Sequence, residues 1–208
     1  MKQEEIARLD EMMKFENELY DNGYDIIAGI DEAGRGPLAG PVVACAVILK
    51  KGEYIEGLND SKKISPKKRE KLYDEITQKC VAYSLGIVDN DVIDEINILE
   101  ATRLAMKKAI EGLSVTPKYL LIDAETHVDT DIPLAGIVKG DSLSVSIAAA
   151  SIIAKVTRDR MLVDFDKEYP QYEFSKHKGY GTALHIQKIG EHGLTPIHRK
   201  TFCSKFVK

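Results

Sequence analysis

The chain has 208 residues, of which 44% are hydrophobic and 30% charged, and it contains no tryptophan. This length can bury one substantial core, so we expect a single domain over residues 1–208, with a basic helical segment at about 170–208. No apolar run reaches the roughly 18 residues of a membrane span, and the N-terminus is charged. We therefore expect no export signal, no membrane contact and a cytoplasmic location.

The three cysteines, Cys45, Cys80 and Cys203, are odd in number, far apart and in no C-x-x-C pair. A disulfide framework and a zinc cluster are therefore both disfavoured. Cys45 stands in a run of valine and alanine residues, where the expected role is that of a small buried hydrophobic side chain.

Positive charge is concentrated in two places, although the net charge is −4. Residues 174–208 contain seven lysines and arginines against one acidic residue, Glu191. A second cluster follows Asp60 and consists of Lys62, Lys63, Lys67, Lys68, Arg69 and Lys71. Because salt screens charges beyond about 8 Å, such patches matter more for binding than the net charge does. Each cluster is either a solvated helix face or a surface for phosphate groups.

The hydrophobic pattern predicts an N-terminal amphipathic helix and then a mixture of strands and helices. Helices are expected over 4–20, 66–79, 97–112, 141–169 and 181–190. Strands are expected over 25–32, 41–50, 81–88, 119–122 and 137–138. Ser65 before Pro66, and Asn97 before Glu100, are the start signals of two helices. Early antiparallel strands followed by alternating helices and strands predict an α/β fold, with a mixed sheet covered by helices on both faces.

Three acidic residues, Asp31, Asp123 and Asp141, each stand at or just past the end of an apolar run. Strand ends on one edge of a sheet converge, and open α/β sheets carry their sites there. Gathered carboxylates repel one another unless a hard cation such as Mg²⁺ or Mn²⁺ lies between them, so the pattern predicts a metal site. The alternatives are a strand-end turn residue for Asp123 and a helix N-cap for Asp141.

Glu32 directly follows Asp31, and the turn Gly34-Arg35-Gly36 comes next. Successive side chains of a strand face opposite ways, so both acids reach one site only if the strand ends or bends there, and Ala33-Gly34 supplies that freedom. A turn with free backbone N–H groups beside a metal site suits phosphate. Alternatively, Asp31 and Glu32 are ordinary turn residues on a solvated edge.

Other motifs for catalysis or cofactor binding are missing from the sequence. It has no P-loop and no H-E-x-x-H motif. Gly34, Gly36 and Gly40 do not have the G-x-G-x-x-G spacing of a dinucleotide-binding site. The five histidines are His127, His177, His185, His192 and His198. For those in the basic segment we favour surface or packing roles over phosphate contacts.

Beyond these patterns, residues 29–43, GIDEAGRGPLAGPVV, closely resemble the signature of the ribonuclease HII family, the type 2 ribonucleases H. The likeness continues through 58–63, 121–123, 140–141, 148–159, 177–182 and 198–199. It spans nearly the whole chain from Tyr24 onward. The sister ribonuclease HIII family carries an N-terminal substrate-binding domain. The residues before Tyr24 are few for such a domain, so we expect the type HII family.

The resemblance implies a ribonuclease H-like catalytic domain, with a mixed sheet flanked by helices and a C-terminal helical segment. It implies a hydrolytic endonuclease that cuts the RNA strand of RNA–DNA hybrids and single ribonucleotides embedded in duplex DNA. The family's catalytic and metal-binding acids fall on Asp31, Glu32, Asp123 and Asp141. Its substrate-binding element falls on Gly34, Arg35 and Gly36, and its substrate-reading tyrosine on Tyr180.

The expected mechanism uses two Mg²⁺ or Mn²⁺ ions, bridged by Asp31 and the scissile phosphate, and leaves 5′-phosphate and 3′-hydroxyl ends. The backbone of residues 34–36 would read the 2′-hydroxyl group, with Tyr180 against the neighbouring deoxyribose. Phosphates would be bound by the basic segment and by Lys62, Lys63 and Lys155. We expect no obligate protein partner and see no clamp-binding peptide in residues 201–208.

Two other functions remain open. One is a ribonuclease H-like nuclease that acts on DNA only. The other is a non-catalytic nucleic-acid-binding protein that uses the basic segment alone, although such a protein has no use for acids at strand ends. Metal-dependent cleavage of a ribonucleotide-containing duplex separates all three.

Overall fold

A five-stranded mixed sheet forms the centre of the molecule in the computed structural model, which describes residues 1–207. The strand order is β3-β2-β1-β4-β5. The strands are β1 (Ile27–Ala33), β2 (Val42–Ile48), β3 (Ala82–Val88), β4 (Tyr119–Asp123) and β5 (Leu134–Ile137). β1, β2 and β3 form an antiparallel meander, whereas β4 runs parallel to β1 and β5 parallel to β4.

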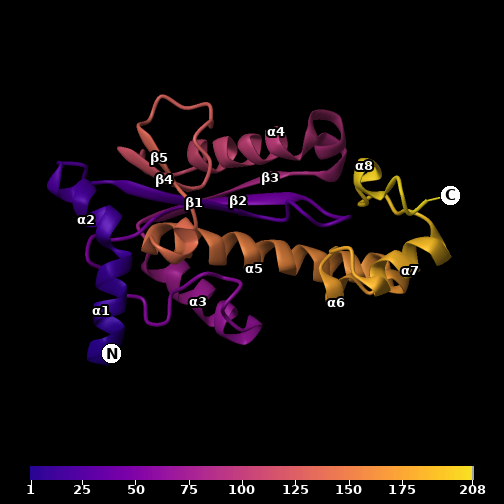
Figure 1. Ribbon diagram of the computed structural model, residues 1–208, viewed down its shortest axis with the longest axis horizontal. Coiled ribbons are helices and arrows are strands. Elements are labelled where there is room, and N and C mark those ends of the chain that lie inside the picture. The colour runs from indigo at the N-terminus through magenta and orange to yellow at the C-terminus, as the bar shows by residue number, and fades with distance from the viewer. Residues whose placement is uncertain (208) are drawn as a thin grey trace.

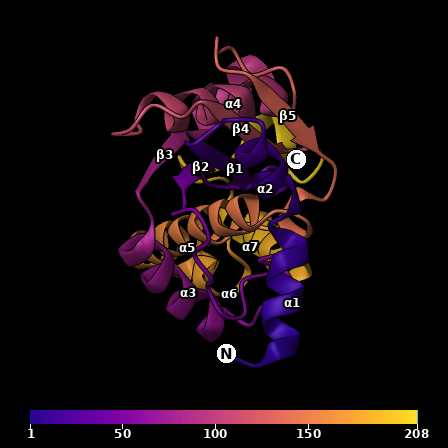
Figure 2. The same ribbon diagram turned by 90° about the vertical axis from the view of Figure 1, so that its left-hand side faces the viewer.

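One long helix covers each face of the sheet, as Figures 1 and 2 show. α4 (Asn90–Glu111) packs on β2 and β3, and α5 (Val145–Glu168) packs on β1 and β2 from the other side, with α3 (Pro66–Lys79) against α5. The packing is close because a glycine lies under each helix. A Cβ atom added to Gly29 would lie 2.1 Å from the carbonyl carbon of Ser146 in α5, and one added to Gly86 would lie 1.8 Å from the carbonyl oxygen of Ala105 in α4.

The remaining helices lie at the two ends of the molecule. The N-terminal pair sits beside the start of β1, and the C-terminal helices lie beyond the far end of the β1–β2 hairpin (Figure 1). The N-terminal helices are α1 (Gln3–Met12) and α2 (Lys14–Asp21); the C-terminal ones are α6 (Phe174–His177), α7 (Ala183–His192) and α8 (Lys200–Cys203). None of the helices described over residues 1–207 has the length and apolar character needed to cross a membrane.

The expected mixed sheet with helices on both faces is confirmed, but several expected elements differ from the structure. The strand expected over 137–138 is β5, which covers Leu134–Ile137. The helix over 4–20 is in fact two helices that meet at Met13. α4 starts at Asn90, seven residues before the predicted start, and Asn97 interrupts it with φ 68° and ψ 166°. Asn97 does act as a cap, since its side-chain oxygen accepts hydrogen bonds from the N–H groups of Leu99 and Glu100 at 2.9 and 3.2 Å.

A further difference concerns the N-terminus of α5, where Asp141 was the candidate cap. Asp141 lies instead in a short 3₁₀ turn, Gly140–Ser142, before the helix. The cap is Ser144, whose hydroxyl oxygen accepts a hydrogen bond from the N–H of Ile147 at 3.2 Å. Asp141 is therefore free of a capping role.

Candidate active site

The parallel pairing of β1 with β4 places Asp31 beside Asp123. Ile30 of β1 is in register with Ile122 of β4, and each aspartate is the next residue of its strand. Because side chains alternate along a strand, residues that follow a matched pair point to the same face. The apolar residues before them fix the register by burying Ile30 and Ile122 completely.

Asp141 reaches the same place by way of a tight turn after β5. Lys139 adopts a left-handed conformation with φ 60°, which turns the chain back toward β4. The N–H of Gly140 then donates a hydrogen bond of 2.7 Å to Oδ1 of Asp123. As a result, carboxylate oxygens of Asp31, Asp123 and Asp141 all lie within 4.8 Å of one another.

This carboxylate cluster carries more negative charge than its surroundings offset. Burial, followed by the charges of Glu32 and Asp123, raises the pKa of Asp31 well above its usual range, and a hydrogen bond from Ser151 opposes the shift. Burial, followed by the charges of Asp60 and Asp123, also raises the pKa of Asp141. The nearest ion pair to the cluster is Lys62 Nζ to Asp141 Oδ2, at 3.7 Å.

The donor set of the cluster fits a divalent cation. Mg²⁺ and Mn²⁺ prefer carboxylate oxygens, and a cation among three such groups would favour their charged forms, which burial otherwise disfavours. The residues that would hold it are Asp31, Asp123 and Asp141, which come from three separate segments of the chain.

Glu32 does not join this cluster. The strand neither ends nor bends at Asp31, because Asp31, Glu32 and Ala33 all stay paired with β2. The Glu32 carboxylate lines the cleft beside the cluster, and burial raises its pKa, with the charge of Arg35 opposing the shift and that of Asp123 adding to it. It lies 3.6 Å from the guanidinium of Arg35. The strand ends only after Ala33, so the expected end or bend at Asp31 is absent, and the place of Glu32 among the metal-binding acids stays a prediction.

A cleft of about 230 Å³ opens beside the cluster. It contains most of the substrate-binding residues expected from the sequence. Its lining residues are Glu32, Ala33, Gly34, Arg35, Gly36, Ser61, Lys62, Ser151, Lys155 and Tyr180. The side chains of Ser61 and Ser151 are buried and hydrogen-bonded to each other at 2.9 Å, and they connect the floor of the cleft to Asp31.

Two buried arginines hold the connection between β1 and β2 in place. Arg199 donates hydrogen bonds to the carbonyl oxygens of Gly34, Arg35 and Gly40 at 2.6 to 3.0 Å. Arg158 donates to the carbonyls of Pro41 and Ala39, each at 2.9 Å, and to that of Lys178 at 3.0 Å. Burial, followed by the charge of Arg158, lowers the pKa of Arg199 to about 9, so it remains protonated at neutral pH.

These two arginines are the structural residues that the sequence analysis missed. The sequence did contain a signal for Arg158, which lies four residues after Ala154 and four before Leu162, so that the three share one helix face. All three side chains are buried in the structure. Arg199 left none, and we had counted it with the phosphate-binding charges. That interpretation is wrong, since its side chain is fully buried and its donors are used by backbone carbonyls.

Tyr180 forms the far wall of the cleft. Its side chain is partly exposed, and two cations lie near the ring: Lys155 Nζ is 5.4 Å from the ring centroid, and the Arg158 guanidinium carbon is 5.7 Å away. Lys155 is itself paired with Asp159 at 2.8 Å. The ring is therefore held at one edge of the cleft with its exposed part available to a ligand.

The comparison with known protein families agrees with this geometry. The family model described as Ribonuclease HII matches residues 28–205. This chain belongs to the ribonuclease HII family. It is therefore a ribonuclease H endonuclease, an enzyme that hydrolyses phosphodiester bonds.

Curated relatives match along almost the whole chain. The ribonuclease HII of Acetivibrio thermocellus is 57% identical over 205 residues, which cover 99% of this chain and 80% of that protein. The ribonuclease HII of Clostridioides difficile is 58% identical over 203 residues, which cover 98% of this chain and 80% of that protein.

Solved structures support the fold in the same way. The ribonuclease H2 of Pyrococcus horikoshii OT3 has a TM-score of 0.73 and 29% identity, over 87% of this chain and 96% of that one. The ribonuclease HII of Archaeoglobus fulgidus, solved in a complex with PCNA, has a TM-score of 0.70 and 25% identity, over 88% of this chain and 95% of that one.

Not every positive residue of this ribonuclease HII chain faces solvent. Arg69, which we had grouped with the lysines after Asp60, is buried and donates to the carbonyls of Ser61 and Ile64. Arg69 therefore holds the loop that carries Lys62 and Lys63, and it does not bind phosphate. Lys63 lies on that loop with Nζ 3.2 Å from the hydroxyl of Ser142. In the basic segment, Lys208 lies outside the described residues.

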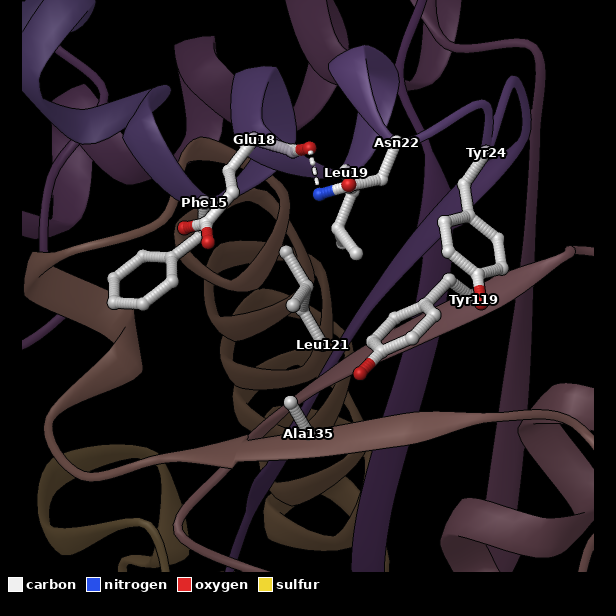
Figure 3. Close-up of a pocket in the computed structure, with 8 residues that line it drawn as sticks. All are labelled: Phe15, Glu18, Leu19, Asn22, Tyr24, Tyr119, Leu121 and Ala135. Carbon is white, nitrogen blue, oxygen red and sulfur yellow. Dashed lines mark hydrogen bonds between the residues drawn. The ribbon is translucent and has the colours of Figure 1, made fainter.

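A larger cavity of about 560 Å³ lies away from the carboxylates, between α2 and the β4–β5 edge of the sheet (Figure 3). The close-up shows the Tyr24 and Tyr119 rings beside each other, edge to face at 4.9 Å. Its full lining is Phe15, Glu18, Leu19, Asn22, Tyr24, Tyr119, Leu121 and Ala135. Glu18 is the one carboxylate among these residues, so the cavity does not offer an alternative metal site.

Proposed function

We propose that this ribonuclease HII enzyme cuts the RNA strand of RNA–DNA hybrids and single ribonucleotides in duplex DNA, with Mg²⁺ or Mn²⁺ bound at the carboxylate cluster. The observation that carries the proposal is the meeting of Asp31, Asp123 and Asp141 within 4.8 Å, at the edge of a cleft walled by the Gly34–Gly36 turn and Tyr180. The expected products carry 5′-phosphate and 3′-hydroxyl ends.

The three aspartates would hold the metal, with Glu32 in the lining of the cleft beside them. A bound pair of such ions supplies an activated water and stabilises charge on the leaving oxygen. The protein's own contribution is to hold the oxygens rigidly: the N–H of Gly140 donates to Asp123, and the N–H of Glu32 donates to Oδ1 of Asp31 at 2.8 Å. Fixed ligands of this kind avoid reorganisation during the reaction.

The Gly34–Gly36 turn is suited to reading the 2′-hydroxyl of a ribonucleotide. Arg199 donates hydrogen bonds to the carbonyl oxygens of Gly34 and Arg35. A ligand at the turn would therefore meet its backbone N–H groups. At Gly36 an added Cβ atom would meet no other atom within 4 Å, so the fold itself does not require a glycine there. Its missing side chain keeps the wall of the cleft open for close approach of a sugar.

Tyr180 and the lysines complete the proposed substrate contacts. The Tyr180 ring would pack against the deoxyribose next to the ribonucleotide, since its exposed part faces the cleft. Lys62, Lys63 and Lys155 surround the site and would bind phosphates, which makes affinity fall as salt rises.

The test is a cleavage assay on two DNA duplexes that differ at one position, where one of them carries a ribonucleotide. We expect cleavage of the ribonucleotide-containing duplex in Mg²⁺ or Mn²⁺, and none in excess chelator or on the all-DNA duplex. Equal cleavage of both duplexes would identify a nuclease that acts on DNA only. Binding without cleavage under every metal condition would identify a non-catalytic nucleic-acid-binding protein.

Substitution of Tyr180 by alanine tests the reading role. We expect Tyr180→Ala to lower the cleavage rate at a single ribonucleotide by about tenfold, as the loss of one sugar-packing contact implies. Gly36→Ala serves as a second probe, because it adds one methyl group to the cleft wall without a clash inside the fold. A Tyr180→Ala rate equal to that of the wild type on this substrate would reject the reading role.

A further inference from the structure

Three histidines outside the carboxylate cluster are buried together beneath Tyr180. His177, His185 and His198 come from α6, α7 and the turn before α8, and His185 and His198 are fully buried. The rings of His177 and His185 stack with centroids 4.2 Å apart. Phe174 packs edge to face against both of these rings. None of these histidines had a role in the sequence analysis beyond packing.

The hydrogen bonds fix which nitrogen of His185 and His198 carries the proton. His185 Nδ1 faces the carbonyl oxygen of Tyr180 at 3.0 Å, so it must be the donor, which leaves Nε2 as an acceptor. His198 Nε2 lies 3.0 Å from that acceptor and therefore donates to it. His198 Nδ1 is then an acceptor, and it receives the N–H of Thr195 at 2.9 Å. Both rings are neutral in this arrangement.

His177 completes the network from the other side of the tyrosine. Its Nδ1 accepts the N–H of Gly179 at 3.2 Å, and its Nε2 donates to the carbonyl of Tyr172 at 2.9 Å. The backbone on both sides of the Tyr180 amide is thus bound by an imidazole. This segment needs such support, because Lys178 adopts the left-handed conformation with φ 51°, which a residue with a Cβ atom takes only at a cost.

Burial favours the neutral form that this pattern requires. It lowers the pKa of His185 and of His198 to about 4, with the charge of the neighbouring histidine as the second cause. Burial lowers the pKa of His177 as well. At neutral pH no positive charge forms in the network, and every imidazole nitrogen has a partner.

We propose that His177, His185 and His198 are positioning residues that hold the Tyr180 ring at the wall of the cleft through the backbone of residues 179–180. The consequence for the reaction rests on the proposed reading role of Tyr180. Without the network, the backbone at Lys178 and Gly179 relaxes and the ring leaves its place near Lys155 and Arg158. The residues act through Tyr180 and do not touch the substrate.

Two substitutions at His185 separate positioning from packing. The amide N–H of an asparagine takes the place of imidazole Nδ1, so His185→Asn keeps the bond to the Tyr180 carbonyl and loses the bond from His198. A glutamine reaches the place of Nε2, so His185→Gln keeps the bond from His198 and loses the one to Tyr180. Both remove the same buried ring, which makes them matched controls for each other.

The first readout is the position of Tyr180 in the free enzyme, measured by the NMR shifts of its ring and of the Gly179 amide. We expect these shifts to change in His185→Gln and to stay close to the wild type in His185→Asn. Equal changes in the two variants, or no change in either, would overturn the proposal. This readout requires no substrate, so it stands whether or not the proposed function holds.

The second readout is cleavage at a single ribonucleotide in duplex DNA. We expect His185→Gln to lower kcat by about tenfold, the worth of one hydrogen bond at this position, and His185→Asn to lower it less. Because the network acts through Tyr180, the double variant Tyr180→Ala/His185→Gln should be no slower than Tyr180→Ala alone. Losses that multiply would contradict the proposal. A fully active Tyr180→Ala would reject the reading role, and the NMR comparison would still decide whether the histidines position the ring.

Discussion

At one side of the cleft, three carboxylates lie within 4.8 Å of one another, whereas at the other side two arginines and three histidines are buried with their polar atoms hydrogen-bonded. The carboxylates share one nearby lysine and hold raised pKa values. The arginines each donate to several backbone carbonyls, and the histidines stay neutral. The carboxylates therefore repel one another unless they are protonated or bind a cation, whereas the polar atoms of the arginines and histidines are satisfied by the protein itself.

This difference matches the two tasks of the proposed function. A metal site has to bind and retain cations, so leaving its charges unsatisfied in the empty protein strengthens binding. A surface that reads the sugar has to keep its shape before substrate arrives, and buried, fully bonded arginines and histidines provide that rigidity. The contrast predicts opposite effects of substitution in the two regions: loss of chemistry in the first and loss of structure in the second.

The largest effect is expected at Asp31. Asp31→Asn removes a charged metal ligand without changing the shape of the side chain, so we expect cleavage to fall by at least about 10³-fold while hybrid binding changes little. Cleavage rate and binding affinity are measured on the same RNA–DNA hybrid. Asp21→Asn, at an exposed position at the end of α2, is the matched control and should retain full activity. An active Asp31→Asn would remove this residue from the metal site.

The next effect is on stability, at Arg199. Arg199→Met leaves the carbonyls of Gly34, Arg35 and Gly40 without their buried donor, and we expect the free energy of unfolding to fall by about 2–4 kcal/mol. Urea denaturation measures the loss. The neighbouring Lys200 has an exposed side chain, so Lys200→Met should change stability by less than about 0.5 kcal/mol. Similar stability of the two variants would show that Arg199 is not holding the turn.

The smallest effect concerns pH. Unfolded histidine binds a proton near pH 6.5, whereas His185 and His198 bind one only near pH 4 in the folded protein. The unfolded state therefore takes up more protons between these values, and the histidines' contribution to stability is lost as pH falls from about 6.5 to about 4. NMR titration of the imidazole C–H signals checks this. Midpoints near 6.5 for both residues would contradict the neutral network.

The carboxylates respond to pH in the opposite direction. The pKa values of Asp31 and Asp141 are raised in the folded state, so without metal their contribution favours folding at acidic pH and is lost as pH rises through the folded values. Measuring the free energy of unfolding against pH, in chelator and again with divalent cation, therefore separates the two regions. The cation should abolish the loss of stability that the carboxylates cause as pH rises, and it should leave the loss that the histidines cause at acidic pH unchanged.

Much of the fold and the centre of the site could be predicted from the sequence because both are encoded locally. Apolar runs with a length typical of strands gave β1, β2, β3 and β4 to within about two residues at each end. The three aspartates of the cluster follow such runs, so the order of the strands in the sheet is enough to bring Asp31, Asp123 and Asp141 to one edge. The roles of these residues in cleavage, and the extent of a single catalytic domain over 1–208, stay predictions.

What could not be predicted depends on contacts between distant segments. The position of Glu32 depends on how far β2 pairs with β1, which the hydrophobic pattern does not reveal. A lysine and a buried arginine count equally in a charge tally, so Arg69 and Arg199 were grouped with phosphate-binding residues. The tautomers of the buried histidines depend on partners from α6, α7 and the turn before α8, and these are adjacent only in the folded chain.

The measurement that tests the central claim most directly is thermal unfolding of the wild type and of Asp31→Asn, each in chelator and in Mg²⁺ or Mn²⁺. At 100 times its dissociation constant a bound cation stabilises a protein by about 2.7 kcal/mol, so we expect the wild-type Tm to rise by several degrees. In chelator Asp31→Asn should be at least as stable as the wild type, because one repelling charge is gone, and added cation should raise its Tm far less. A wild-type Tm that does not respond to the cation, or an equal rise in both proteins, would contradict a metal site built on the three aspartates.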